Sequence, residues 1–239
     1  MKVAAYQAPL LPSDPAGTIE HIRKQIDRCE AEGVSMLCCP EAVLGGLADY
    51  AEQMNEIGYD LCELASVLKP LISGTVTTII GFTEKSDNDL YNSAAIFHRC
   101  AVIGIYRKMH PAIRRSVYAA GTELPVFTVG NLMFGILICN DSNFPEHAAD
   151  LAARGAKVVF IPSNNALPHD RKDITGDALR VDIATARANN IYVVRSDVAG
   201  KTETLTAHGS TSIVAPDGSI LQSAKRGTEE LLIADLQFS

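Results

Sequence analysis

The sequence contains no tryptophan, no long apolar run and no cluster of basic residues. A helix that crosses a bilayer needs about 20 mostly apolar residues, and no run approaches that length, so we expect no membrane contact. Asp and Glu number 28 against 21 Lys and Arg, which gives a formal net charge of -7. Nucleic acid is therefore not an expected partner. The CxxC and HExxH patterns are also missing, which predicts a protein without bound metal.

The six cysteines are spread widely along a chain of 239 residues. This spread favours reduced thiols over the dense disulfide framework of small secreted proteins. The first residues, "MKVAAYQAPLLPSDP", form a short apolar stretch that prolines interrupt. Such a stretch is typical of a strand followed by a loop and not of a signal peptide. We therefore expect a cytoplasmic protein.

Strand and helix patterns alternate along the chain. Asp14 as a cap, Pro15 in the first turn and Gly33 at the end predict a helix over 14–33. Apolar runs separated by Gly, Asn, Asp or Pro predict many strands. Further helices are predicted near 61–71, 143–155 and 175–190. Without a visible repeat or linker, the pattern predicts one α/β domain over residues 1–239, with a large sheet content.

Three apolar runs end abruptly on a chemically reactive side chain. "SMLCCPE" ends at Glu41, "VIGIYRK" at Lys108 and "FGILIC" at Cys139. In α/β folds the carboxyl ends of strands line the ligand crevice, so these side chains are expected to meet at one sheet edge. Taken singly, each has a plainer interpretation: a buried small thiol, a carboxylate in a first helical turn and a solvated cation.

The residues that follow Cys139 favour the chemical interpretation. A helix is expected to begin near Phe144 and Pro145, and its dipole, with Lys108, should lower the pKa of the Cys139 thiol. A thiolate is a nucleophile. Glu41 could then act as general base and later as general acid. Lys108 and the N–H of Asn140 could stabilise an oxyanion.

These residues resemble the nitrilase, or carbon–nitrogen hydrolase, superfamily. "CCPEAVLGG" matches its glutamate block, "YRKMHP" its lysine block and "ICNDSNFPE" its cysteine block, and the resemblance covers essentially the whole chain. It implies an α-β-β-α sandwich that often pairs into homodimers, with a Glu41–Lys108–Cys139 catalytic triad. It also implies hydrolysis of a small-molecule amide, carbamoyl compound or nitrile through a covalent thioester or thioimidate. No metal and no organic cofactor is implied.

The chain departs from the family pattern in the loop after the lysine. Many amidases of the family carry a second glutamate there, at the position of Ser116. Glu123 is the nearest downstream carboxylate. Either Glu123 or no residue fills that role, so the positioning of the substrate amide stays open.

A second departure follows the cysteine. Nitrilases tend to have Trp–Glu there, whereas this chain has no tryptophan at all. N-carbamoyl-D-amino acid hydrolases place arginines where Ser142 and Asn143 stand. We therefore expect hydrolysis of a neutral or short aliphatic amide, with an N-carbamoyl compound as the alternative substrate. Arg114 or Arg115 could supply a carboxylate site instead.

Four polar residues near the predicted crevice are candidates for substrate binding, or for holding loop backbone in place. They are Asn140, Asn164, Asn165 and Tyr118. Asp182 and Arg187 share a predicted helix, where an intrahelical or structural ion pair is their expected role. Two other function classes remain open: a non-catalytic binding or scaffold protein of the same fold, and a redox-sensing thiol protein.

Overall fold

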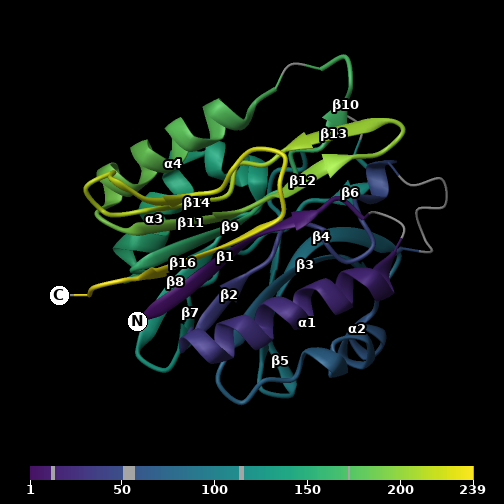
Figure 1. Ribbon diagram of the computed structural model, residues 1–239, viewed down its shortest axis with the longest axis horizontal. Coiled ribbons are helices and arrows are strands. Elements are labelled where there is room, and N and C mark those ends of the chain that lie inside the picture. Colours follow the sequence, from purple (N-terminus) through teal and green to yellow (C-terminus); the bar gives the residue numbers. More distant parts are fainter. Residues whose placement is uncertain (12–13, 51–56, 113–115, 172, 239) are drawn as a thin grey trace.

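Two β-sheets pack face to face and carry helices on their outer surfaces (Figure 1). The computed structural model describes residues 1–11, 14–50, 57–112, 116–171 and 173–238. Helices α1 (Pro15–Glu32) and α2 (Leu61–Val67) cover the larger sheet. Helices α3 (Pro145–Ala153) and α4 (Thr175–Asn189) cover the smaller one. This arrangement confirms the predicted α-β-β-α sandwich.

The larger sheet combines a parallel centre with antiparallel strands. Its strands are β1 (Lys2–Pro9), β2 (Met36–Cys38), β3 (Thr77–Ser86), β4 (Asp89–His98), β5 (Ala101–Arg107), β6 (Tyr118–Ala119), β10 (Leu167–Pro168), β12 (Val198–Lys201), β13 (Leu205–His208) and β16 (Glu230–Asp235). Strands β1, β2 and β3 run parallel, while β4 and β5 each reverse direction. Strands β2 and β5 therefore point the same way, so their carboxyl ends lie at the same end of the sheet.

The smaller sheet has a parallel core and antiparallel edges. Its strands are β7 (Phe127–Val129), β8 (Leu132–Ile136), β9 (Val158–Pro162), β11 (Tyr192–Ser196), β14 (Ser212–Val214) and β15 (Ile220–Ser223). Strands β8, β9 and β11 run parallel. Short 3-10 helices connect elements of both sheets: η1 (Ala48–Tyr50), η3 (Lys69–Leu71) and η4 (Cys139–Asn143).

The helix signals of the sequence are matched by local geometry. Asp14 accepts a hydrogen bond from the backbone N–H of Gly17 at 2.8 Å, and Gly33 ends α1 with a left-handed φ of 69°. On the other side of the molecule, Leu151 of α3 packs directly over β8. A Cβ atom at Gly135 would lie 2.5 Å from a methyl carbon of Leu151, so only glycine allows this close approach.

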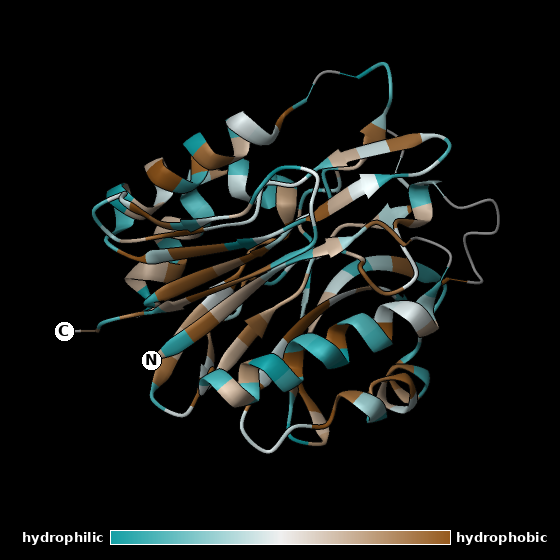
Figure 2. Ribbon diagram, in the orientation of Figure 1, coloured by the Kyte–Doolittle hydropathy of each residue, from teal (hydrophilic) through white to brown (hydrophobic). Residues whose placement is uncertain are grey.

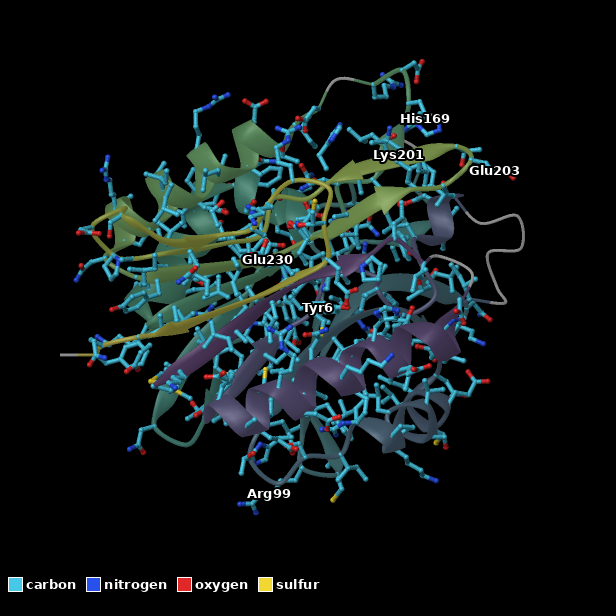
Figure 3. The ribbon with its side chains drawn as sticks, viewed as in Figure 1. Tyr6, Arg99, His169, Lys201, Glu203 and Glu230 are labelled. Atoms are coloured by element: carbon cyan, nitrogen blue, oxygen red, sulfur yellow. The ribbon has the colours of Figure 1, made fainter. Side chains whose placement is uncertain are left out.

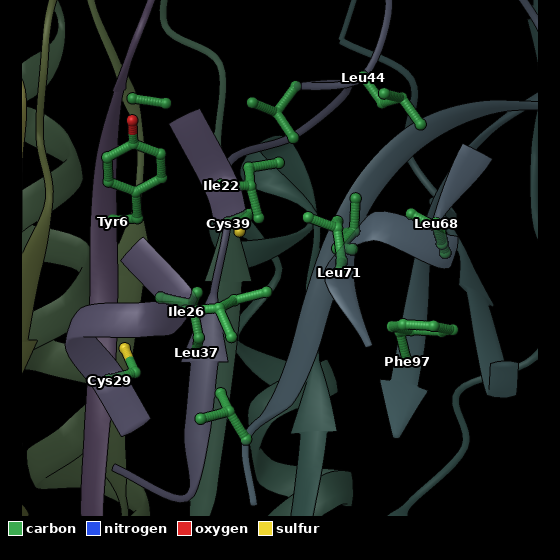
Figure 4. Packing of buried hydrophobic residues seen from close by; sticks show 14 of the residues in the cluster. Tyr6, Ile22, Ile26, Cys29, Leu37, Cys39, Leu44, Leu68, Leu71 and Phe97 are labelled. Carbon is green, nitrogen blue, oxygen red and sulfur yellow. The ribbon is translucent and has the colours of Figure 1, made fainter. Parts of the chain in front are cut away.

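Apolar side chains fill three layers. Ile22 and Ile26 of α1 pack on Leu37 and Phe82 of the larger sheet, in the layer shown in Figure 4. Between the sheets, Phe134 packs in a layer of apolar side chains to which strands β1, β2, β9 and β11 also contribute. Figure 2 shows apolar strands in the interior and polar residues along the outer face of α1. Among the described residues, no helix is both long and apolar enough to cross a membrane.

Candidate functional site

The structure brings Glu41, Lys108 and Cys139 together, but from two sheets and not from one. Glu41 follows β2 and Lys108 follows β5, both in the larger sheet, whereas Cys139 follows β8 in the smaller sheet. The expectation of a single sheet edge is therefore wrong. The sequence shows where strands end, but which sheet contains each strand depends on pairing between distant segments. The backbone N–H of Glu41 donates to the carbonyl of Ser163, just after β9, and joins the two sheets here.

Glu41 lies at the centre of the cluster and is buried. Its Oε1 atom accepts hydrogen bonds from Lys108 Nζ and from Asn92 Nδ2, the latter at 2.7 Å. Its Oε2 atom accepts from the backbone N–H of Asn164 at 2.8 Å. A Cβ atom at Gly81 would lie 2.7 Å from the Cα atom of Glu41, so glycine is required under this turn. Both carboxylate oxygens are thus held in a fixed orientation.

Lys108 supplies a fixed positive charge. Burial favours the neutral amine, but the acidic groups around it, first Glu41, hold the pKa of Lys108 above its ordinary value. The ammonium group is only 4% exposed and pairs with Glu41. Glu41 and Lys108 therefore form a buried ion pair beside the sulfur.

Cys139 adopts a left-handed backbone conformation at the start of η4, with φ of 47°. Such conformations are uncommon for non-glycine residues and are held by their surroundings. Asp141 provides that support, because it accepts hydrogen bonds from the N–H of Ile138 at 3.1 Å, the hydroxyl of Tyr106 at 2.7 Å and the N–H of His110 at 2.8 Å. Asp141 was not among the predicted site residues, although it stands in the same polar stretch as Cys139.

The resting thiol is not activated in the way that the sequence predicts. Burial, together with the negative charge of Glu41, raises the pKa of Cys139 to about 12, and Lys108 and Arg195 only partly oppose this. Helix α3 begins at Pro145, with η4 between it and the sulfur, so its dipole acts from a distance. The predicted lowering of the thiol pKa is wrong. Cys139 is a neutral thiol at neutral pH.

Asn165 is in direct contact with the sulfur. The Cys139 Sγ atom lies 3.6 Å from Asn165 Oδ1 and donates to it. Asn165 is held in turn by the buried Asp197, which accepts from its Nδ2 at 2.9 Å and from its backbone N–H at 3.0 Å. The sequence contains a signal for Asn165, which follows the β9 run, whereas nothing in the sequence distinguishes Asp197 from other acidic residues after strands.

The buried Arg195 stabilises the backbone turn at Cys139 through Ser142. Arg195 donates to Asp182 from Nε at 2.7 Å and from Nη2 at 2.6 Å, and its Nη2 also reaches Ser142 Oγ at 3.0 Å. Ser142 donates to the carbonyl of Cys139 at 2.7 Å. Although burial opposes it, Asp182 holds the pKa of Arg195 above its ordinary value. These hydrogen bonds hold the backbone carbonyl of Cys139 in a fixed position.

The ion pair predicted between Asp182 and Arg187 does not form. Asp182 pairs with Arg195 from β11, and Arg187 donates from Nε to the carbonyl of Asp217 at 2.8 Å. The two predicted partners are five positions apart in the sequence, and side chains at that spacing lie on different faces of a helix, unlike those three or four apart.

Two of the predicted substrate-binding asparagines, Asn140 and Asn164, contact protein atoms. Asn140 donates from Nδ2 to the carbonyl of His110 at 3.1 Å and accepts from Asn143 at 3.1 Å. Asn164 holds Glu41 through its backbone N–H. These contacts place both residues beside the cluster. Any contact with a substrate stays a prediction.

Tyr118 lies under the same site and is buried. Its hydroxyl accepts from the N–H of Ala48 at 2.7 Å and shares a hydrogen bond with Thr83 at 2.7 Å. Tyr118 therefore fastens η1 to β3, and its hydroxyl already has two partners.

Glu123, the one candidate for the second glutamate, lies in a different groove from the Glu41 cluster. Glu123 is exposed and shares a groove with Arg107, which points to the opposite face of β5 from Lys108. Ser116 donates to Asp49 Oδ2 at 3.1 Å, so an aspartate of η1 occupies this side of the site. Arg114 and Arg115 lie outside the described residues.

Known proteins resemble this chain in sequence and in fold. The family model for Carbon-nitrogen hydrolase matches residues 2–239. A protein described as "Hydrolase in pqqF 5'region" from Pseudomonas protegens is 31% identical over 98% of this chain and 81% of its own. A nitrilase from Pyrococcus abyssi is 29% identical over 99% of this chain and 89% of its own. A solved mutant of the amidase from Nesterenkonia sp. AN1, with acrylamide added at its active-site cysteine, has a TM-score of 0.79 and 22% identity over 99% of this chain and 93% of that one.

Proposed function

The chain belongs to the carbon-nitrogen hydrolase family, and we propose that it hydrolyses the C–N bond of a small amide through a thioester on Cys139. The observation that carries this proposal is the buried contact between Glu41 and Lys108 beside the Cys139 sulfur. A carboxylate, an ammonium and a thiol at one point supply a base, an oxyanion donor and a nucleophile.

Acylation begins with proton transfer, because the thiol is neutral at rest. Glu41 takes the proton from Cys139, and the sulfur attacks the amide carbon. The carbonyl oxygen becomes an oxyanion, which Lys108 and the N–H of Asn140 stabilise. One such donor is worth about 3–4 kcal/mol of transition-state stabilisation. The first N–H groups of a helix have no acceptor within it, so the start of η4 offers a donor at this position.

Loss of the amine completes acylation, and attack of water on the thioester is deacylation; Glu41 acts as acid in the first and again as base in the second. Protonated Glu41 gives its proton to the leaving nitrogen, the C–N bond breaks, and ammonia or an amine leaves behind a thioester. Glu41 then takes a proton from water, and the resulting hydroxide attacks the thioester carbon. The C–S bond breaks, a carboxylic acid is released, and the proton returns to the sulfur.

The reported relatives include a nitrilase and an amidase, and the sequence favours the amide as substrate. The similar Nesterenkonia protein is an amidase with an active-site cysteine, and this chain lacks the tryptophan that tends to follow the nitrilase cysteine. A purely redox role is disfavoured, because a thiol with a raised pKa forms little of the thiolate that oxidants attack. A non-catalytic role would leave the buried ion pair at Glu41 unexplained.

Ammonia release from a panel of small molecules tests the proposal. The panel contains aliphatic amides, ω-amides of dicarboxylic acids, N-carbamoyl compounds and nitriles. We expect turnover of at least one amide and none of the nitriles. If no compound in the panel releases ammonia and none leaves an acyl group on the protein, the amidase proposal is wrong.

Lys108→Ala should lower kcat by about 10²–10³-fold and change KM much less. The expected split follows from the role of the ammonium, which interacts most strongly with charge that develops in the transition state. Steady-state kinetics on an amide from the panel measures both constants. Lys157→Ala, an exposed lysine at the start of β9, is the matched control and should behave as wild type. An unchanged kcat in Lys108→Ala would remove the lysine from the mechanism.

A further inference from the structure

A cavity of about 500 Å³ lies next to the candidate site. The loop after β9 and the hairpin of β12 and β13 form its walls. Figure 3 shows His169 and Lys201 in this region, with Glu203 at the outer tip of the hairpin. The volume is within the usual range for small-molecule pockets, about 300–1,000 Å³.

Asn165 connects the cavity to the sulfur. It lines the cavity and accepts the hydrogen bond from Cys139. Cys139 is itself partly exposed. Asn165 is therefore shared by the site and the cavity, so a molecule bound at the sulfur lies one residue away from the cavity.

The cavity wall carries a net positive charge. Arg171 and Lys201 line it, and in the ranges that the structure describes neither forms an ion pair. The one acidic side chain among the described lining residues is Asp173, which is paired with Arg226. Although burial opposes it, hydrogen bonds from Thr175 and Arg226 lower the pKa of Asp173 to about 2. Its charge is thereby balanced, and the charges of Arg171 and Lys201 remain.

His169 connects the two walls of the cavity, the loop after β9 and the β12–β13 hairpin. His169 contacts Thr206 Oγ1 through Nδ1 at 2.7 Å and the carbonyl of Glu203 through Nε2 at 2.9 Å. These contacts join the loop that carries Arg171 to the hairpin that carries Lys201. The two cations are therefore carried by connected elements that line one cavity.

The charges of Arg171 and of Glu41 in the candidate site both act on Tyr50. Burial and the negative charges of Asp49 and Glu41 raise the pKa of Tyr50, and the Arg171 guanidinium opposes this shift. The Tyr50 hydroxyl is thus within electrostatic range of both Glu41 and Arg171.

We propose that this cavity binds a carboxylate of the substrate, and that Arg171 and Lys201 select amides that carry one a few bonds from the scissile carbonyl. This inference rests on the proposed amidase function and names its substrate class. A guanidinium or ammonium that contacts a carboxylate strengthens binding by about tenfold to a hundredfold. It also revises the expectation of a neutral substrate, which was based on Ser142 and Asn143. Ser142 is bonded to Arg195 and Cys139 instead of lining an empty carboxylate site.

Matched substrate pairs test the inference by turnover. The monoamides of succinic, glutaric and adipic acid are compared with butanamide, pentanamide and hexanamide. At least one monoamide should exceed its neutral partner tenfold or more in kcat/KM. Arg171→Gln combined with Lys201→Met should remove that preference, mostly by raising KM for the monoamide. Lys157→Met is the control for loss of a surface lysine.

Binding to the Cys139→Ala protein separates this inference from the proposed function. Calorimetry should show that the preferred monoamide binds, and that the double variant weakens it at least tenfold. Charge-dependent binding without turnover by the wild type would leave the anion site standing and overturn the amidase proposal. Turnover of neutral amides with no preference for a monoamide, or a preference that survives the double variant, would overturn the anion site alone.

Discussion

Replacement of Cys139 by alanine should reduce amide hydrolysis by about 10⁴-fold or more while the protein remains folded. The sulfur is the proposed point of attachment of the acyl group, so no thioester forms without it. The backbone should not change, because alanine keeps the Cβ atom and cysteine already tolerates the φ of 47°. Removal of one sulfur atom forfeits only a few van der Waals contacts. Ammonia release and thermal unfolding measure the two effects.

A covalent adduct identifies the nucleophile directly. Mass spectrometry of wild type mixed with substrate should show an acyl group on Cys139, and the alanine variant should show none. Cys62→Ala, which removes an exposed cysteine of α2, should keep full activity and full labelling. An adduct on Cys38 or Cys39, or an active Cys139→Ala protein, would assign the chemistry to another residue.

The three reactive residues could be predicted because each stands at a visible boundary. Glu41, Lys108 and Cys139 each follow an apolar run, and such a boundary marks the end of a strand. The α-β-β-α arrangement could be predicted from the family resemblance of the blocks around these residues. The end-to-end order of helices and strands follows from caps and periodicity, as Asp14 and Gly33 show for α1.

The partners of these residues could not be predicted, because they come from distant parts of the chain. Asp182 in α4 pairs with Arg195 in β11. The sequence instead suggested Arg187, which lies on the same helix as Asp182. Asp141 and Asp197 look in the sequence like ordinary acidic residues after strands. In the structure, both are buried and bond backbone N–H groups next to the sulfur, at Ile138 and Asn165.

The thiol pKa of Cys139 shows most clearly what a sequence cannot supply. The residue types around it, a lysine and a following helix, favour a lowered pKa. The sign is decided by two other quantities, burial of the sulfur and its position relative to Glu41, and both raise the pKa. A neutral thiol next to a carboxylate needs a base in the acylation step. The geometry therefore gives Glu41 a larger role than the sequence indicates.

Glu41→Gln should reduce the rate of acylation by about 10²–10⁴-fold, because the amide has the shape of the carboxylate but cannot take the thiol proton. The variant should also be less stable. Glu41 accepts from Lys108 and Asn92 on one oxygen and from the N–H of Asn164 on the other. Glutamine has one acceptor atom, so one buried donor loses its partner, at about 1–3 kcal/mol. Quenched-flow labelling and thermal unfolding measure these effects.

The same Glu41→Gln substitution should make the Cys139 thiol more reactive, although it makes the enzyme less active on amides. The negative charge of Glu41 raises the pKa of Cys139, and the positive charge of Lys108 lowers it. Removal of the carboxylate leaves the lysine unopposed, so the pKa should fall from about 12 and more thiolate should form at a given pH. The rate at which a small uncharged thiol reagent modifies Cys139 should therefore rise with pH earlier in Glu41→Gln than in wild type. A variant that is more reactive toward the reagent and less active on amides requires Glu41 to be the base. If reactivity and turnover fall together with no shift along the pH axis, Glu41 only holds the site in shape.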